Sequence, residues 1–180
     1  MSTTTQNQLR STYAGITLTG NPHPLSAWFV LALRLVMGGM ILFAGISKLT
    51  GDPFDASGYL VHGVDSASPV SGLYAEIAAT PWLLEFTNFV IPTTQVLIGL
   101  ALIFGGFVRL AALGGALQMI MFYLGGWEGD WLAFFDNTLI YMVVFLAIGA
   151  FAAGRIVGID RYLENHSLVE RYPKLRYLLG

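Results

Sequence analysis

Four long apolar segments constrain this chain more than any other feature of its sequence. A bilayer core about 30 Å thick requires roughly 20 consecutive apolar residues for each spanning helix. Isolated apolar strands would leave backbone groups unpaired in lipid, so helices are the expected form. The segments of sufficient length are residues 25–49, 82–104, 107–125 and 131–154. We therefore predict an all-α integral membrane protein that folds as a four-helix bundle.

The composition excludes several other classes of protein. Charged residues make up only 11% of the chain and hydrophobic residues 55%, whereas a soluble domain carries roughly 25% charge. With a net charge of −2, neither a soluble domain nor a disordered or nucleic-acid-binding chain is expected. The absence of cysteine excludes iron–sulfur clusters and covalently attached haem. The sequence therefore predicts no metal and no covalently bound cofactor, and its motifs identify no catalytic residue.

The positive charges predict how the bundle sits in the cell membrane. Arg10 precedes the first span, Arg109 lies in the turn between the second and third, and five more Lys or Arg residues follow the fourth. The other two loops carry acidic residues and no basic ones. Because cytoplasmic loops are enriched in Lys and Arg, we predict a multi-pass protein with both termini in the cytoplasm.

One domain accounts for most of the chain. Residues 1–24 are polar and contain Asn-Pro-His-Pro, which indicates an irregular cytoplasmic arm. The membrane domain covers 25–158, and its outer loop at 50–81 has apolar residues at the spacing of an interfacial helix. Those residues are Val70, Leu73, Tyr74 and Ile77. The tail at 159–180 is amphipathic and is expected on the inner leaflet.

Three polar residues inside the spans are candidates for a ligand site. An ionisable or polar group at membrane depth costs free energy and needs a partner. Counting 1.5 Å per residue from each helix start places Arg34, Gln95 and Gln118 at about the same depth. We predict that they line a midplane pocket for a head group. Two alternatives stay open: Arg34 snorkels or binds helix-end carbonyls, and the two glutamines form interhelical hydrogen bonds.

A second set of polar residues is expected near the outer face. Its members are Lys48, Glu85, Asn88, Asp136 and Asn137. They form a predicted outer polar cluster, or alternatively they are ordinary charges at the level of the lipid headgroups.

Three ordered runs of sequence resemble a known family. The first run contains Arg34-x3-Gly38 and Phe43-Ala-Gly45-Ile-Ser-Lys48-Leu49. The second run contains Gln95-x3-Gly99-Leu-Ala-Leu and Gly105-Gly106-Phe-x-Arg109-Leu-Ala-Ala. The third run contains Gly149 and Gly154-Arg-x2-Gly158-Ile-Asp160. Together they resemble the DoxX/DoxD family of small four-helix membrane proteins. The loop sequence Gly58-Tyr59-Leu60 is similar to the DoxD-like branch.

The resemblance implies a function in quinone chemistry. DoxD-type proteins are membrane subunits of a thiosulfate:quinone oxidoreductase or accompany terminal quinol oxidases, so quinone is the expected substrate. Arg34, Gln95 and Gln118 would then contact the quinone, and Lys48 would attract an anionic substrate to the outer mouth. At Gln95 many relatives carry an acidic residue, and a glutamine cannot exchange protons.

The expected partners are the lipid bilayer, other membrane subunits of a redox complex and a second copy of the chain in a homo-oligomer. Two alternatives remain. One is a non-catalytic structural or assembly subunit, which predicts a filled bundle. The other is a small carrier, for which paired broken helices are expected.

Overall fold

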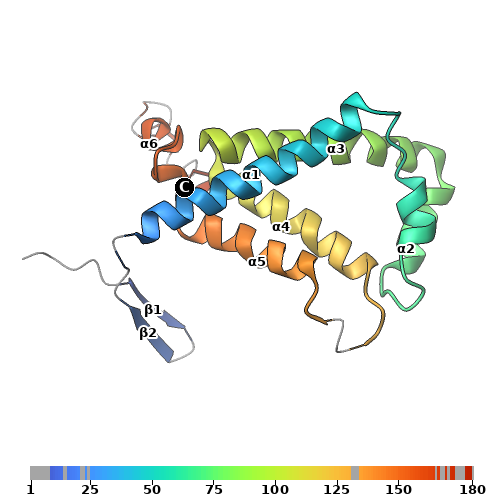
Figure 1. Cartoon of the computed structure of the whole chain (residues 1–180), viewed down its shortest axis with the longest axis horizontal. Helices are drawn as coiled ribbons and strands as arrows, with labels where there is room; N and C mark the ends of the chain where they lie inside the picture. The colour runs from blue at the N-terminus through green and yellow to red at the C-terminus, as the bar shows by residue number, and fades with distance from the viewer. Residues whose placement is uncertain are drawn as a thin grey trace, which may run out of the picture.

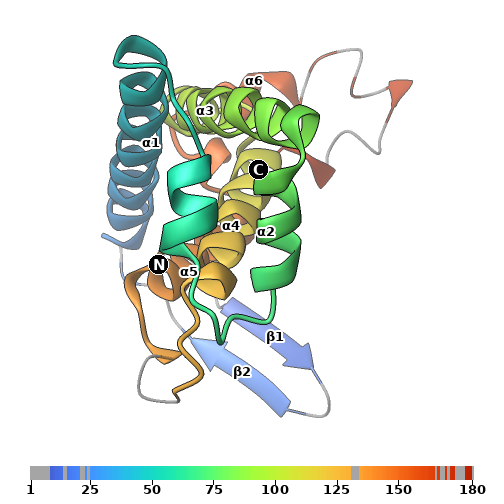
Figure 2. The same cartoon turned by 90° about the vertical axis from the view of Figure 1, so that its right-hand side faces the viewer.

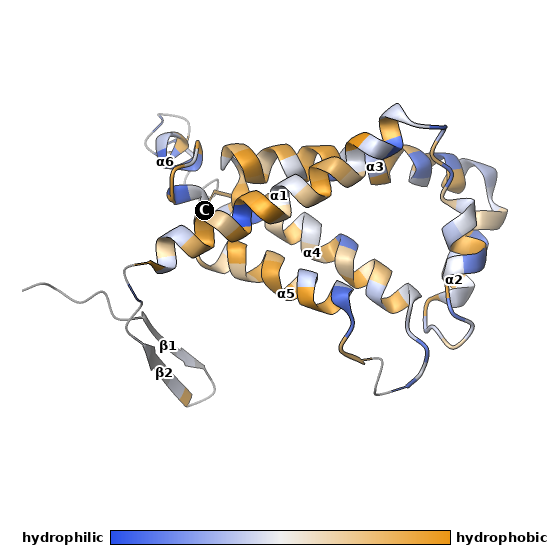
Figure 3. Cartoon of the chain, viewed as in Figure 1, coloured by the Kyte–Doolittle hydropathy of each residue, from blue (hydrophilic) through white to orange (hydrophobic). Residues whose placement is uncertain are grey.

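The computed structural model describes residues 9–13, 16–20, 23, 25–130, 134–164, 166, 169, 171–172 and 177–179. Four apolar helices pack antiparallel: α1 (Ser26–Thr50), α3 (Pro81–Phe104), α4 (Val108–Gly125) and α5 (Asn137–Ala150) (Figure 1). Among the described residues, α1, α3 and α4 are long and apolar enough to cross a membrane. The predicted all-helical membrane bundle is confirmed. Hydrophobic residues predominate along these helices, while the connections at both ends are more hydrophilic (Figure 3).

The fourth predicted span is shorter than its hydropathy indicated. Helix α5 has 14 residues, against a prediction of 131–154, and residues 131–133 lie outside the described part. Asp136 starts the helix by accepting a hydrogen bond from the Leu139 amide. The helix ends at Ala150, and Ala152 then adopts a left-handed φ of 51° before the short 3₁₀ turn η3 (Ala153–Arg155). Hydropathy counts apolar residues and does not detect such a backbone break.

Glycines bring α1 and α3 into close contact. A Cβ added at Gly99 would lie 2.5 Å from Leu42 Cβ, and one added at Gly45 would lie 2.8 Å from the Val96 backbone nitrogen. Small residues allow membrane helices to approach in this way, where dispersion forces hold them together. Helices α4 and α5 form a second close pair, in which the Phe145 ring lies over Gly115. By comparison, α3 and α4 pack loosely on each other.

The bundle has two distinct ends. The turn end consists of residues 105–107 and 151–160, which include the start of α6 (Asp160–Leu163). The loop end consists of residues 51–80 and the described part of 126–136. In Figure 2, which looks onto the loop end, α2 (Ser71–Ala79) crosses in front of the bundle. The expected loop helix is therefore present.

The loop end has a small core of its own. Tyr74 and Leu60 are buried there, with Leu60 on the π-helical turn η1 (Tyr59–Gly63). The Tyr74 hydroxyl donates to the Met121 carbonyl over 2.8 Å. Burial, with a smaller contribution from the neighbouring Tyr59, raises the pKa of Tyr74 to about 12. Helix α2 thus packs its tyrosine onto α4, while Leu73 is exposed.

Both terminal segments differ from their predictions. The predicted irregular arm contains an antiparallel hairpin of β1 (Leu9–Tyr13) and β2 (Ile16–Gly20), which Figures 1 and 2 show apart from the helices. In the tail, α6 has only four residues. Tyr162 is exposed whereas Val169 is buried, so the described tail residues do not present one continuous apolar face.

The α1–α3 contact leads to a stability prediction. Gly99→Ala should lower the free energy of unfolding by about 1–3 kcal/mol, because the new methyl group meets the backbone of α1. Gly39→Ala is the matched control, since nothing lies within 4 Å of its added Cβ. Thermal unfolding in mild detergent measures both variants, and equal melting temperatures would contradict the close packing.

The raised pKa of Tyr74 predicts a loss of stability at alkaline pH. An unfolded tyrosine ionises near pH 10, whereas buried Tyr74 stays neutral until about pH 12. Its stabilising contribution is therefore complete below pH 10 and is lost as the pH rises toward 12. Tyr74→Phe should be less stable than wild type at pH 7, by about 0.5–1.5 kcal/mol, yet lose less stability between pH 10 and 12. Parallel pH–stability curves for the two proteins would refute this assignment.

Candidate functional site

Arg34 binds the backbone of the turn end and is almost fully buried. Its Nη1 donates to the Ala153 carbonyl and to the Ile156 carbonyl at 2.9 Å, and its Nη2 donates to the Val157 carbonyl at 2.9 Å. Its exposed fraction is only 1%. A guanidinium carries five donors in a planar fork, so one side chain binds three backbone carbonyls of the segment after α5, of which Ala153 O also accepts from the Ile156 amide. The Arg34 Nε is buried and has no hydrogen-bond partner in the described chain. The carbonyl-binding alternative for Arg34 is the observed one.

Asp160 completes this arrangement from the other side of the turn. Its carboxylate accepts from the backbone amides of Phe107 and Val108 at 2.6 and 3.0 Å, which lie at the start of α4. A negative charge is favourable at a helix N-terminus. Asp160 is fully buried, and its negative charge interacts electrostatically with the Arg34 guanidinium. Arg34 and Asp160 therefore join α1, the α3–α4 turn and the segment after α5.

Close backbone approach at this end requires glycine. Gly105 has a left-handed φ of 68°, and a Cβ there would lie 2.6 Å from Gly158 Cα and 2.9 Å from Arg34 Nη1. The two glycines of the family-like runs at 105 and 158 thus make room for the guanidinium. The arrangement is a structural tie, and neither Arg34 nor Asp160 lines the groove between α3 and α4 or the smaller cavity between α4 and α5.

The structure places the three residues of the predicted midplane grouping in different contacts. Gln95 faces α1 and accepts a hydrogen bond from Lys48 Nζ at 3.1 Å, while Gln118 faces Thr94. The depth estimate started every helix at one plane. Instead α3 extends past the end of α1, so that Gly45 of α1 lies opposite Gln95 and Val96. This overlap brings Lys48, expected near the outer face, to the level of Gln95.

The predicted outer cluster does not assemble either. Lys48 donates to the Ala44 carbonyl and Gln95, and lies 5.7 Å from the centre of the Phe54 ring. In the described chain it forms no ion pair with Glu85, which is exposed, or with Asp136, the cap of α5. Asn88 accepts from the Ala56 amide at 2.7 Å and so positions the outer loop. Asn137 is the exposed first residue of α5.

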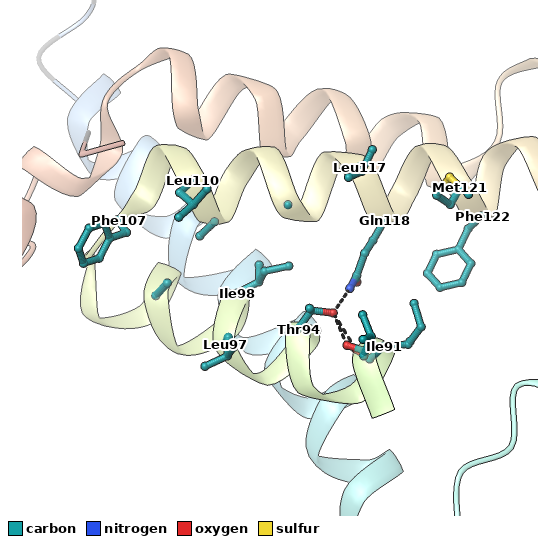
Figure 4. Close-up of a pocket in the computed structure, with 14 residues that line it drawn as sticks. Ile91, Thr94, Leu97, Ile98, Phe107, Leu110, Leu117, Gln118, Met121 and Phe122 are labelled. Carbon is teal, nitrogen blue, oxygen red and sulfur yellow. Dashed lines mark hydrogen bonds between the residues drawn. The ribbon is translucent and has the colours of Figure 1, made fainter. Parts of the chain in front are cut away.

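A groove of about 660 Å³ lies between α3 and α4. Its wall is apolar except for Thr94 and Gln118, and Phe107 and Phe122 lie toward its two ends (Figure 4). Leu97 and Leu117 line the groove and are 60% and 62% exposed. Since the exposed surface of these helices is the surface that faces lipid, the groove opens sideways to the bilayer. Neither Arg34 nor Gln95 lines it.

One polar pair crosses the groove. Gln118 Nε2 donates to the Thr94 hydroxyl over 2.6 Å, and that hydroxyl donates to the Val90 or Ile91 carbonyl of its own helix, at 2.7 and 3.1 Å (Figure 4). Pro92 in the same turn has no amide hydrogen to offer to α3, although the helix runs through it without interruption. Gln118 Oε1 is buried and has no partner in the described chain.

Sequence reasoning identified Gln118 and missed the rest of the groove. A usable signal was present, because Ala111, Gly114 and Gln118 follow a spacing of three and four residues and share one face of α4. Small residues before a polar one leave space next to it. Thr94 gave no signal, since a threonine in a membrane helix commonly bonds its own backbone.

The structural role of Arg34 can be tested by substitution. Arg34→Met should lower the free energy of unfolding by about 3–5 kcal/mol, because it leaves Asp160 and three carbonyls without their cation. The control is Arg155→Met, which removes a half-exposed ion pair with Glu164 and should cost at most about 1 kcal/mol. Thermal unfolding in detergent measures both. A stable Arg34→Met protein would show that the tie does not hold the turn end.

The comparisons with known proteins agree with this architecture. The DoxX family model matches residues 29–127, a segment that runs from α1 to the end of α4 and contains every residue of the groove. Neither a curated protein nor a solved structure matched the chain. Because the matched segment covers more than half of the sequence, the chain belongs to the DoxX family.

Proposed function

We propose that this DoxX-family protein is a membrane subunit of a quinone-linked respiratory or sulfur-oxidising complex, and that it binds quinone in the α3–α4 groove. One observation carries the proposal: the groove is open to lipid and apolar, with a single amide–hydroxyl pair in its wall. A quinone is dissolved in the bilayer and reaches a protein site from the side. Its polar oxygens sit on a flat ring with an apolar tail, which matches this wall.

The dimensions of the groove also support a small lipophilic ligand. Ligand sites commonly measure about 300–1,000 Å³ and are lined by apolar side chains with few polar groups. The groove, at about 660 Å³, lies within this range. Gln118 and Thr94 would meet a head-group oxygen, and the leucines along both helices would contact the tail. Arg34 and Gln95 have no part in this version of the site, because both are committed to interhelical bonds.

The other elements of the proposal follow from the charge distribution. The turn end would face the cytoplasm, as would both termini, with α2 on the outer side. Lys48 would support the α1–α3 contact instead of attracting an anion, because Phe54 and Gln95 cover its ammonium group. Partner subunits would store and deliver the electrons.

The alternatives predict different helix packing. A purely structural subunit favours a filled bundle, and the open groove favours a bound ligand instead. A small carrier favours paired broken helices, whereas α1, α3 and α4 each run unbroken.

Photoaffinity labelling tests the site. A photoreactive quinone analogue should label peptides from residues 90–101 and 110–122 of the protein in lipid nanodiscs, and excess unlabelled quinone should remove the label. Leu117→Trp should lower the labelling at least about fivefold, because the indole fills the mouth of the groove. Ile140→Trp is the control, since Ile140 is a similarly exposed residue on α5 outside the groove.

Two results would contradict the proposal. One is labelling spread evenly over all lipid-facing helices. The other is a cross-link between the α3 and α4 peptides and a second polypeptide, which would show that a partner helix or another copy of the chain fills the groove.

A further inference from the structure

We propose that the groove selects the reduced, hydroxyl-bearing form of its ligand, because Gln118 presents a hydrogen-bond acceptor without a partner. This inference rests on the proposed function and names the form of the quinone that binds more tightly. It uses three observations: the orientation of the Gln118 amide, the burial of its oxygen and the chemistry of the surrounding wall.

The Thr94 hydroxyl sets the orientation of the amide. Its one hydrogen is directed to the Val90 or Ile91 carbonyl, at 2.7 and 3.1 Å, so toward Gln118 the hydroxyl oxygen can only accept. It accepts from Nε2 over 2.6 Å. The opposite amide orientation would place the carbonyl oxygen of Gln118 against an oxygen with no hydrogen to give. The side-chain atom left without any partner is therefore Oε1, an acceptor, while Nε2 already bonds Thr94 and keeps one further N–H.

This oxygen is costly to leave unpaired. Gln118 Oε1 is buried and has no hydrogen-bond partner in the described chain. A buried acceptor without a donor is destabilising. A ligand that brings an O–H group removes this cost. Gln118 lines the groove, and the broad last torsion of a glutamine side chain lets the amide adjust to such a donor.

The two redox forms of a quinone differ in this one respect. A hydroquinone hydroxyl can donate to Gln118 Oε1, whereas a quinone carbonyl is itself an acceptor and faces a second acceptor. Apart from Thr94 and Gln118, the side chains that line the groove are apolar. Gln118 Oε1 is the polar atom of this wall that is buried and lacks a partner, so the form of the ligand that donates to it, the hydroquinone, is favoured.

Binding of the two forms tests the selection. We would measure the affinity of the protein in detergent for a benzoquinone with a decyl tail, oxidised and then chemically reduced without oxygen, and subtract binding to empty micelles. The hydroquinone should bind about tenfold more tightly, as one good hydrogen bond to an otherwise unpaired group implies. For a two-electron couple this raises the midpoint potential of the bound ligand by about 30 mV.

Two variants assign the preference to the amide. Gln118→Met keeps the volume and removes the acceptor, so the ratio of the two affinities should fall to about one. Thr94→Val frees the NH₂ group of Gln118 to bind a quinone carbonyl. The ratio of hydroquinone to quinone affinity should then fall, because quinone binds more tightly. A wild-type ratio that survives in both variants would overturn the inference.

The outcomes also separate this inference from the function on which it rests. If both forms bind equally well and Leu117→Trp weakens both, the groove is a quinone site without selection, and the inference is wrong. If neither form binds above the empty-micelle level, the proposed function and the inference fail together. If quinone bound more tightly than hydroquinone, Gln118 would act as a donor to the ligand and the inference would be wrong.

Discussion

The rest of the bundle depends on the contact between the Arg34 guanidinium and the carbonyls of the turn end. Where α5 stops, the chain leaves the α-helix, and in a membrane the backbone carbonyls of such a segment are costly without partners. Arg34 pairs three of them and balances Asp160, which in turn holds the first amides of α4. The α3–α4 contact beyond this turn is looser than the α1–α3 contact. The looser α3–α4 contact leaves the groove.

A membrane makes some parts of such a fold easy to predict. Helices α1, α3 and α4 begin and end within one residue of the predicted spans, because lipid permits no other structure for a long apolar segment. Helix α5 is harder, since its end depends on the left-handed backbone at Ala152. The β1–β2 hairpin was missed because β1 has no apolar–polar alternation and the hairpin adjoins a segment rich in turn residues, although residues 16–19 of β2 do alternate.

Counting residues along each helix predicts which polar side chains lie inside the membrane, but it does not predict their partners. It identified Arg34, Gln95 and Gln118 as residues that need partners, and each has at least one. It assigned the wrong partners, because the offset between two helices is set by the glycines at their contact. The close contact at Gly45 and Gly99 brings Lys48 next to Gln95. The close contact at Gly105 and Gly158 brings Arg34 next to the turn end. Arg34 Nε and Gln118 Oε1 are the buried side-chain atoms of the described residues without a partner, and of the two residues Gln118 is the one that lines the groove.

A division of roles within the family fold follows from these contacts. The buried polar residues Arg34 and Gln95 hold parts of the bundle together, whereas Gln118 and Thr94 line the groove between α3 and α4. The central claim is that this cavity holds quinone, and the quinone content of the purified protein measures it most directly. The account predicts about one quinone per chain after isolation from its native membrane in mild detergent, well above the content of the co-purified lipid, and a large loss in Leu117→Trp. Quinone present only in proportion to the lipid, in wild type and variant alike, would contradict it.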